Sequence, residues 1–250
     1  MICSFILGLF PLNIDEQNSK IYKYINYHYL KKFLSIELTE EELKKITVSN
    51  FMTKDRIFKE KYYYIRISSI DSGVTLKILK ILFFTKLTNG NLKINDLSFR
   101  INNIYHSGNW AKQLNIDELI SKELKNEIKL RIVTPIFFKI GNEYINSLEP
   151  IYIFKNLIKK IKESSLNEHF ILKNIKNFNI DRVEIIESNL ESREIRKLKT
   201  TGSIGNITLI IRSSIEEEIL FFNVLLYFAF FSGIGYMTER GYGCIELSQD

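Results

Sequence analysis

The chain has 250 residues, with 35 Lys and Arg against 29 Asp and Glu, so its formal net charge is +6. Hydrophobic residues make up 45% of it, and only 3 Pro and 11 Gly interrupt them, which excludes a mainly disordered chain and provides enough apolar material for a core. The small positive excess is compatible with an anionic partner but does not identify one.

The first half of the chain alternates predicted strands and helices. Residues 2–9 are apolar and follow no basic leader, so we expect a buried strand and not a signal peptide. Residues 21–36 form the first expected helix, because their apolar side chains recur on one helical face. We then expect strands at 46–52 and 61–69, a helix at 74–85, and a strand within 92–105 after the turn signal Asn89-Gly90.

The second half repeats this order. Residues 127–140 are typical of a strand, in which Pro135 indicates an edge position or a bulge. Pro150 starts the next expected helix, which ends at residue 162. We then expect a hairpin of strands 180–188 and 204–212 joined by a long basic segment, a helix over 215–231 capped by Ser214, and a strand at 242–247.

These elements predict an α+β fold with two tandem βαββαβ units of the ferredoxin-like, or RRM-like, kind. The expected domains are residues 1–118 and residues 119–250, the second carrying a glycine-rich loop. A single irregular α+β domain is the alternative. This fold hosts many functions, so it does not by itself indicate one.

Cysteine and histidine positions limit the kinds of site. Cys3 and Cys244 exclude a disulfide framework and a cysteine-based zinc site. His28, His106 and His169 lie far apart and lack the short spacings of metal ligands on one helix, so we expect no metal and no cofactor. The apolar stretch 219–232 is shorter than the roughly 20 residues that span a bilayer, so we expect a soluble, cytoplasmic protein.

The most distinctive local feature is the segment GIGYMTERGYG at 233–243, here called the glycine loop. Glycine permits positive φ and close backbone approach, so successive N–H groups could face a phosphate. Tyr236 and Tyr242 could stack on a base, and Arg240 adds a positive charge. A connection that merely needs tight turns explains the same spacing. The candidate RNA-binding residues of the loop are Gly233, Gly235, Arg240, Gly241 and Gly243.

The glycine loop resembles the signature of the CRISPR-associated endoribonucleases that process precursor CRISPR RNA, a family of the RAMP superfamily. Three further stretches are similar to that family in the same order. They are ITVSNFM with KYYYIRISSID (46–52 and 61–71), GNWAKQLNIDELI (108–120), and LRIVTPIFFKIGNEY with EPIYIFKNLIKKI (130–144 and 149–161). The resemblance implies two ferredoxin-like domains.

The resemblance also implies an activity. In this family the ribose 2′-OH attacks the neighbouring phosphate without a metal, leaving a 2′,3′-cyclic phosphate and a 5′-OH. That reaction needs a general base, a general acid and a cation, and histidine suits the first two roles. The implied partners are precursor and processed CRISPR repeat RNA. Membership of a CRISPR effector complex and formation of a homodimer are further alternatives.

The family places its catalytic histidine just after the first helix, but residues 35–51 contain none. The nearest candidate is His28, inside the expected first helix, although a lone helical histidine is more often a surface or packing residue. Lys44 or Lys45 matches a lysine of some members, and Tyr29 beside His28 could donate a proton. The catalytic candidates are therefore His28, Lys44 and Tyr29. For His106 we expect turn contacts and for His169 an exposed position.

A second RNA-binding element is expected between the hairpin strands at 192–203, where the family uses a basic hairpin; its candidates are Arg193, Arg196, Lys197 and Lys199. Lys159, Lys160 and Lys162 are more typical of a solvated helix face. The leading function is a repeat-processing endoribonuclease. The alternatives are a catalytically inactive RAMP subunit that binds guide RNA, which the missing histidine keeps open, and a tandem ferredoxin-like protein that binds a small ligand or a protein.

Overall fold

The computed structural model describes residues 2–12, 27–49, 61–94, 97–108, 110–121 and 123–247. Contacts divide the chain into two compact units. The N-terminal unit consists mainly of Ile2–Gln113, with Glu239–Gly241, and the C-terminal unit consists of Leu114–Thr238 with Tyr242–Asp250. The expected division after residue 118 lies inside helix α4 (Ile116–Ile120). Among the described residues, no helix is long and apolar enough to cross a membrane.

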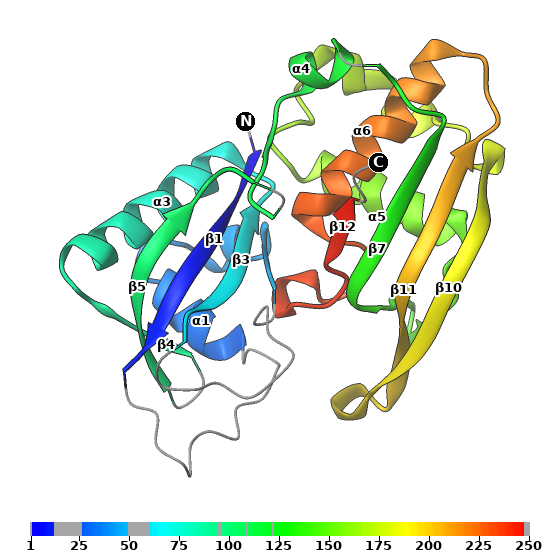
Figure 1. Ribbon diagram of the computed structural model, residues 1–250. Coiled ribbons are helices and arrows are strands. Elements are labelled where there is room, and N and C mark those ends of the chain that lie inside the picture. The colour runs from blue at the N-terminus through cyan, green and yellow to red at the C-terminus, as the bar shows by residue number, and fades with distance from the viewer. Residues whose placement is uncertain are drawn as a thin grey trace. The chain divides into compact units, whose positions relative to one another are not determined.

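The N-terminal unit pairs an antiparallel sheet with helices on one face (Figure 1). Its strand order is β2-β3-β1-β5-β4, which is the ferredoxin-like order with β4 added at the edge. Apolar side chains alternate along the strands, so one face builds the core. The elements are β1 (Ile2–Pro11), α1 (Tyr27–Leu34), α2 (Glu40–Leu43), β2 (Ile46–Val48), β3 (Tyr63–Ser69), α3 (Ser72–Leu87), β4 (Asn91–Ile94) and β5 (Leu97–Tyr105).

Two short elements follow in the chain, β6 (Gln113–Leu114) and α4. The C-terminal unit then continues with β7 (Glu127–Ile136), the hairpin β8 (Phe138–Ile140) and β9 (Glu143–Ile145), and α5 (Pro150–Lys162). The 3₁₀ helices η1 (Phe170–Asn177) and η2 (Ile180–Arg182) lead to β10 (Val183–Ile195). The remaining elements are η3 (Arg196–Leu198), β11 (Thr200–Ile211), α6 (Glu216–Ser232), η4 (Thr238–Arg240) and β12 (Ile245–Leu247).

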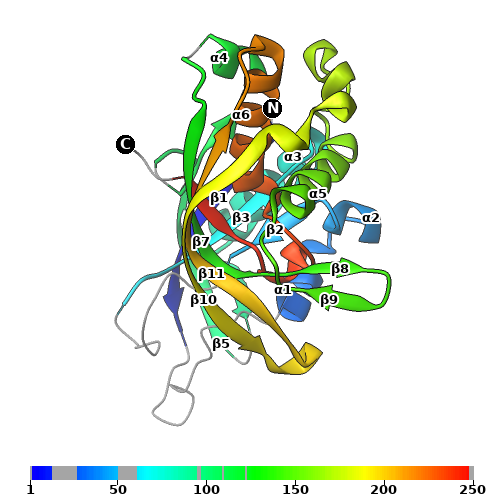
Figure 2. The same cartoon turned by 90° about the vertical axis from the view of Figure 1, so that its right-hand side faces the viewer.

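The second sheet repeats the order of the first. Its strands run β10-β11-β7-β12, all antiparallel, and this is the same βαββαβ arrangement. Figure 2 shows α5 and α6 on one face of this sheet. The predicted α+β fold of two tandem ferredoxin-like units is therefore confirmed.

Helix α6 packs apolar side chains all round, and eleven of its residues from Phe221 to Ser232 are buried. It begins one residue later than expected, and Ser214 does not cap it. The N-cap is Ile215, which makes no side-chain cap, and its N–H donates to the Ser213 hydroxyl (3.1 Å). The three glutamates of the first turn still face the positive end of the helix dipole.

Strand β7 explains the unusual Pro135. The strand is not at an edge, because β11 and β12 pair with its two sides. The β11 register shifts between Ser203, opposite Ile136, and Gly205, opposite Ile132. Pro135 lies in this irregularity, where a missing N–H interrupts no ladder, so of the two expected alternatives the bulge is correct.

The hairpin of β10 and β11 differs from its prediction. A long basic segment was expected between strands 180–188 and 204–212, but the strands continue to Ile195 and resume at Thr200. The residues between Glu187 and Glu194 are exposed and, apart from Leu190, polar, so their side chains do not indicate a strand. Backbone pairing with β11 forms the strand regardless, because ladder hydrogen bonds do not depend on the side chains.

Candidate nucleic-acid interface

The glycine loop connects α6 to β12, and its conformation requires glycine. Gly233, Gly235, Gly241 and Gly243 all have positive φ, between 63° and 93°. A Cβ on Gly243 would overlap the carbonyl oxygen of Ile234, and one on Gly235 would lie 2.5 Å from the carbonyl oxygen of Phe137. Both backbone conformation and close approach therefore exclude other residues at these two positions.

Several amides of the glycine loop donate within the protein. Ile234 N–H donates to the Gly243 carbonyl (2.9 Å), Tyr236 N–H to the Phe137 carbonyl (2.8 Å) and Gly243 N–H to the Pro135 carbonyl (3.0 Å). These hydrogen bonds fasten the loop to the bulged end of β7. These three N–H groups are therefore not directed at a phosphate.

Helix α5 braces the loop from the other side. The Asn156 side chain accepts from Gly235 N–H (2.9 Å) and donates to the Gly235 carbonyl (3.4 Å). One turn later, the Lys160 ammonium donates to the carbonyls of Ser232 and Gly233, both at 3.0 Å, and to the Thr238 hydroxyl at 3.1 Å.

The interpretation of Lys160 as part of a solvated face was wrong, because its ammonium group satisfies carbonyls at the end of α6. The i, i+4 spacing of Asn156 and Lys160 places both on one helix face, which is the sequence signal that was missed. Lys159 and Lys162 do face outward. They line a hollow of about 750 Å³ between α5 and residues 176–181, together with Lys155 and Lys176.

Tyr236 and Tyr242, which we expected to stack on a base, pack around one phenylalanine. Their rings lie edge-on to Phe137, with centroid distances of 5.9 and 5.3 Å. Tyr144 of β9 joins at 5.8 Å, and the Lys139 ammonium lies 5.6 Å from the Tyr236 centroid. The tyrosines are half-buried in this cluster, which holds the β8–β9 hairpin against the loop.

Arg240 is the exposed cation of the glycine loop. It ends the short helix η4, and its side chain is 55% exposed. The neighbouring Glu239 carboxylate lies 3.5 Å from its guanidinium. An exposed pair of this kind is weak, so the guanidinium can exchange the carboxylate for a phosphate.

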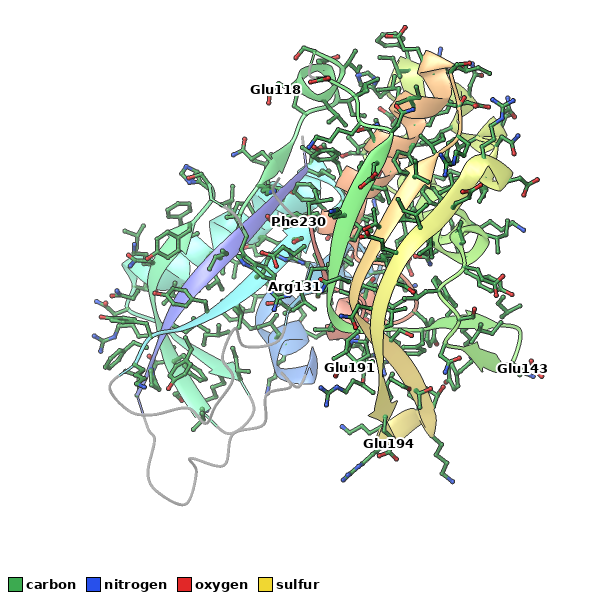
Figure 3. The ribbon with its side chains drawn as sticks, turned by 45° about the vertical axis from the view of Figure 1, so that its right-hand side comes forward. Glu118, Arg131, Glu143, Glu191, Glu194 and Phe230 are labelled. Atoms are coloured by element: carbon green, nitrogen blue, oxygen red, sulfur yellow. The ribbon has the colours of Figure 1, made fainter. Side chains whose placement is uncertain are left out.

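The four basic candidates of the second element gather at the end of the β10–β11 hairpin. Arg193 is in β10, Arg196 and Lys197 are in η3, and Lys199 takes the left-handed turn conformation with φ of 50°. All four are exposed. Glu191 lies 2.9 Å from Arg193 and Glu194 lies 3.3 Å from Arg196, and Figure 3 shows both glutamates near the hairpin tip.

We call this end of the hairpin, residues 193–199, the hairpin tip. Its four cations are partly balanced by the two carboxylates. No ion pair joins Lys197 or Lys199 to the part of the chain that the structure describes. Exposed ion pairs contribute little to stability, so the arginines keep their capacity to contact phosphates.

The catalytic candidates lie in the N-terminal unit. His28 and Tyr29 belong to the first turn of α1, and their side chains are outside the described part of the structure. Lys44 follows α2, and its side chain is 67% exposed and pairs with Glu41 at 2.6 Å. The exposed pair with Glu41 is weak, so the Lys44 ammonium keeps its capacity to approach a phosphate.

Lys45, the alternative to Lys44, has a structural contact. Its ammonium lies 2.7 Å from Asp71, whose carboxylate also caps α3 by accepting from Val74 N–H at 3.0 Å. Burial raises the pKa of Asp71, but the hydrogen bonds from Lys45 and Val74 outweigh it, so the pKa lies below its ordinary value. Of the two neighbouring lysines, Lys45 therefore supports the start of α3 and Lys44 is the more exposed.

The other two histidines have different surroundings. His106 is exposed after β5. His169 was expected to be exposed, but its side chain is only 22% exposed. Its Nε2 lies 3.3 Å from Asp117 of α4, and its ring stacks on Phe170 at 5.1 Å. These contacts join the segment after α5 to α4, which is a packing role.

Known proteins resemble this chain in both sequence and fold. Residues 130–245, from β7 through the glycine loop to β12, match the family described as CRISPR-associated endoribonuclease Cas6. The resemblance noted in the sequence is confirmed. No curated protein sequence matches the chain.

Solved Cas6 structures share the fold over their full length. The product complex of Cas6 (TTHA0078) is 18% identical with a TM-score of 0.78, and the alignment covers 100% of both chains. The product complex of Cas6 (TTHB231), a Thermus thermophilus protein, is 19% identical with a TM-score of 0.78 over 99% of each chain. A structure described as a RAMP protein binding different RNA substrates is 19% identical, with a TM-score of 0.60 over 99% of this chain and 100% of that one.

Proposed function

We propose that the chain is an endoribonuclease that cleaves CRISPR repeat RNA to release guide RNAs. The observation that carries this proposal is the Cas6 family match over residues 130–245, which includes the glycine loop and its bracing strand and helix. The similar folds of two Cas6 proteins described as product complexes support it. The RNA is the proposed partner, in both precursor and processed forms.

The proposed reaction is a metal-independent transesterification. The ribose 2′-OH attacks the adjacent phosphorus, the bond to the 5′-oxygen breaks, and the products carry a 2′,3′-cyclic phosphate and a 5′-OH. A base removes the 2′-OH proton, an acid protonates the leaving oxygen, and a cation balances the charge on the phosphorane. We assign these roles to His28 and Tyr29, in the first turn of α1, and to Lys44, which follows α2.

RNA binding is assigned to two elements within residues 119–250. At the hairpin tip, Arg193, Arg196, Lys197 and Lys199 are exposed and can contact phosphates without disturbing the sheet. In the glycine loop Arg240 is the side chain with that capacity, while Gly233, Gly235, Gly241 and Gly243 set the backbone path. We place the domains at residues 1–118 and 119–250, and the protein in the cytoplasm.

The second candidate function is a catalytically inactive RAMP subunit that holds guide RNA, within an effector complex or as a homodimer. The absence of histidine from residues 35–51 favours it. An end-labelled repeat RNA separates the two. A single cut supports the endoribonuclease, whereas tight binding without a cut supports the inactive subunit, and failure to bind contradicts both.

The assignment of His28 is tested by His28→Ala, with His106→Ala as the matched control, because His106 is exposed and outside the proposed site. We expect the first variant to lose cleavage and keep RNA binding, and the second to behave like the native protein. Unchanged cleavage by the His28 variant would reject the assignment.

A further inference from the structure

The sheet of the N-terminal unit has one face that its helices do not cover. Leu7 and Leu9 of β1 are fully buried in the core, so Gly8 and Phe10 lie on the opposite face. The same alternation in β3 buries Tyr63 and leaves Tyr64 outward. Figure 1 shows β3, β1 and β5 side by side. We call this outward surface the aromatic face; its residues are Gly8, Phe10, Tyr62, Tyr64, Arg100, Asn103 and Tyr105.

Two tyrosines meet across the central strand of the aromatic face. Gly8 lies opposite Tyr64 of β3 on one side and opposite Asn103 of β5 on the other. Because Gly8 has no side chain, the rings of Tyr64 and Tyr105 approach each other over β1, with centroids 6.3 Å apart. Asn103 Nδ2 donates to the Tyr105 hydroxyl at 3.1 Å and so orients that ring.

A second aromatic pair continues the face along the strands. The rings of Phe10 and Tyr62 lie 5.4 Å apart at an interplanar angle of 55°. Tyr62 is 50% exposed, Tyr105 41% and Tyr64 36%. A cluster of exposed aromatic side chains on one sheet surface is typical of a binding site.

The charge of this sheet points to an anion. The described residues of β1 to β5 include Arg66, Lys93 and Arg100 but no Asp or Glu. Arg100 is exposed and lies opposite Phe10, beside the second aromatic pair. Rings beside the exposed Arg100, on strands that carry no carboxylate among their described residues, complement a strand of nucleotides, whose bases stack and whose phosphates are negative.

One end of the sheet surface is already occupied by the chain itself. The Ser4 hydroxyl accepts from Lys112 N–H at 2.8 Å, and the Arg66 guanidinium lies 5.2 Å from the Trp110 ring centroid. Arg66 is only 1% exposed under this cover. Residues 110–112 therefore cover one end of the sheet surface, and the aromatic face is the part beyond them that a ligand can reach.

We propose that the aromatic face stacks unpaired bases of a single-stranded RNA, with Tyr64 and Tyr105 as one stacking position and Phe10 and Tyr62 as the next. Base stacking on aromatic side chains tolerates any sequence, because every base has a flat face. The proposal rests on the proposed function, since it takes RNA as the ligand. It adds a binding surface for unstructured RNA that is separate from the hairpin tip and the glycine loop.

The test measures binding of an unstructured ten-nucleotide RNA that carries one 2-aminopurine. The test variant combines Tyr64→Ala with Tyr105→Ala. One control combines Tyr64→Phe with Tyr105→Phe and so keeps both rings. The other control, Phe84→Ala, removes an aromatic side chain that is 68% exposed on α3. We expect about tenfold weaker binding for each ring removed and loss of 2-aminopurine quenching. The phenylalanine variant and the Phe84 control should bind like the native protein.

The proposal would be overturned if the alanine variant bound the RNA and quenched 2-aminopurine as the native protein does. It would also be overturned if the phenylalanine variant lost as much affinity as the alanine variant, or if the native protein did not bind this RNA. Photo-crosslinking of the native protein to a 5-iodouridine RNA is a second measurement. Because it uses no variant, misfolding of a variant cannot affect it. Crosslinks on peptides with Tyr64 or Tyr105 support the proposal, and crosslinks confined to other peptides contradict it. Cleavage of the repeat RNA is assayed separately. If the native protein cleaves repeat RNA but does not bind the unstructured RNA through these tyrosines, only the proposal for the aromatic face is rejected.

Discussion

Asn156 and Gly235 hydrogen-bond to each other in both directions, through Gly235 N–H to Oδ1 at 2.9 Å and through Nδ2 to the Gly235 carbonyl at 3.4 Å. This pair fixes the middle of the glycine loop to α5. Lys160 fixes its start by donating to the carbonyls of Ser232 and Gly233. The conformation of the loop therefore depends on a helix that is more than seventy residues earlier in the chain.

Replacing Lys160 with methionine should destabilise the protein by about 2 kcal/mol, because three acceptors lose a charged donor while the aliphatic stem is kept. Lys159→Met is the matched control, since Lys159 is the exposed neighbour on the same helix. Urea unfolding followed by circular dichroism measures both. Equal stability of the two variants would contradict the bracing role of Lys160.

Replacing Gly243 with alanine should prevent the native loop from forming, because the new Cβ would overlap the Ile234 carbonyl. Gly141→Ala is the control. Its φ of 58° is close to the 64° of Gly243, but a Cβ there would meet no atom within 4 Å. We expect a destabilisation of about 1 kcal/mol at Gly141 from backbone strain alone and a much larger one at Gly243. Similar melting temperatures for the two variants would show that close approach is unimportant.

Stability should depend on pH through Asp71. Its folded-state pKa lies below the ordinary value of 3.8, with the Lys45 and Val74 hydrogen bonds outweighing burial. The stabilisation is therefore complete above that value and is lost as the pH falls through the folded-state pKa. Asp71→Asn should be less stable than the native protein at pH 6, and the difference should shrink below pH 4. A difference that is constant from pH 6 to pH 3 would contradict this linkage.

Much of the fold follows from the sequence because alternating apolar residues define the strands of both sheets. The pattern failed at β10, where mostly polar, exposed residues are held in a strand by backbone pairing with β11. It failed again at Lys160, since the sequence indicates the helix face but not the carbonyls that the ammonium reaches. Tyr64 and Tyr105 are far apart in the chain, so only the sheet register shows that they meet across Gly8.

The hairpin tip should give RNA binding its salt dependence. Changing Arg193, Arg196, Lys197 and Lys199 to glutamine should weaken repeat RNA binding and reduce the slope of log K against log salt by about 0.7 for each phosphate that the tip no longer neutralises. Lys86→Gln, at the exposed end of α3, is the control and should leave the slope unchanged. Fluorescence anisotropy over a series of salt concentrations measures the slope. An unchanged slope in the hairpin variant would reject phosphate binding by the tip.

Cleavage of a labelled repeat RNA in EDTA tests the central claim most directly. The RNA is compared with the same RNA carrying a single 2′-deoxy nucleotide at the cut, and the product ends are analysed by mass spectrometry. We predict one cut in the all-ribose RNA, with a 2′,3′-cyclic phosphate and a 5′-OH, and no cut in the 2′-deoxy RNA. Binding without cutting, or cutting of the 2′-deoxy RNA, would contradict the proposed endoribonuclease and its mechanism.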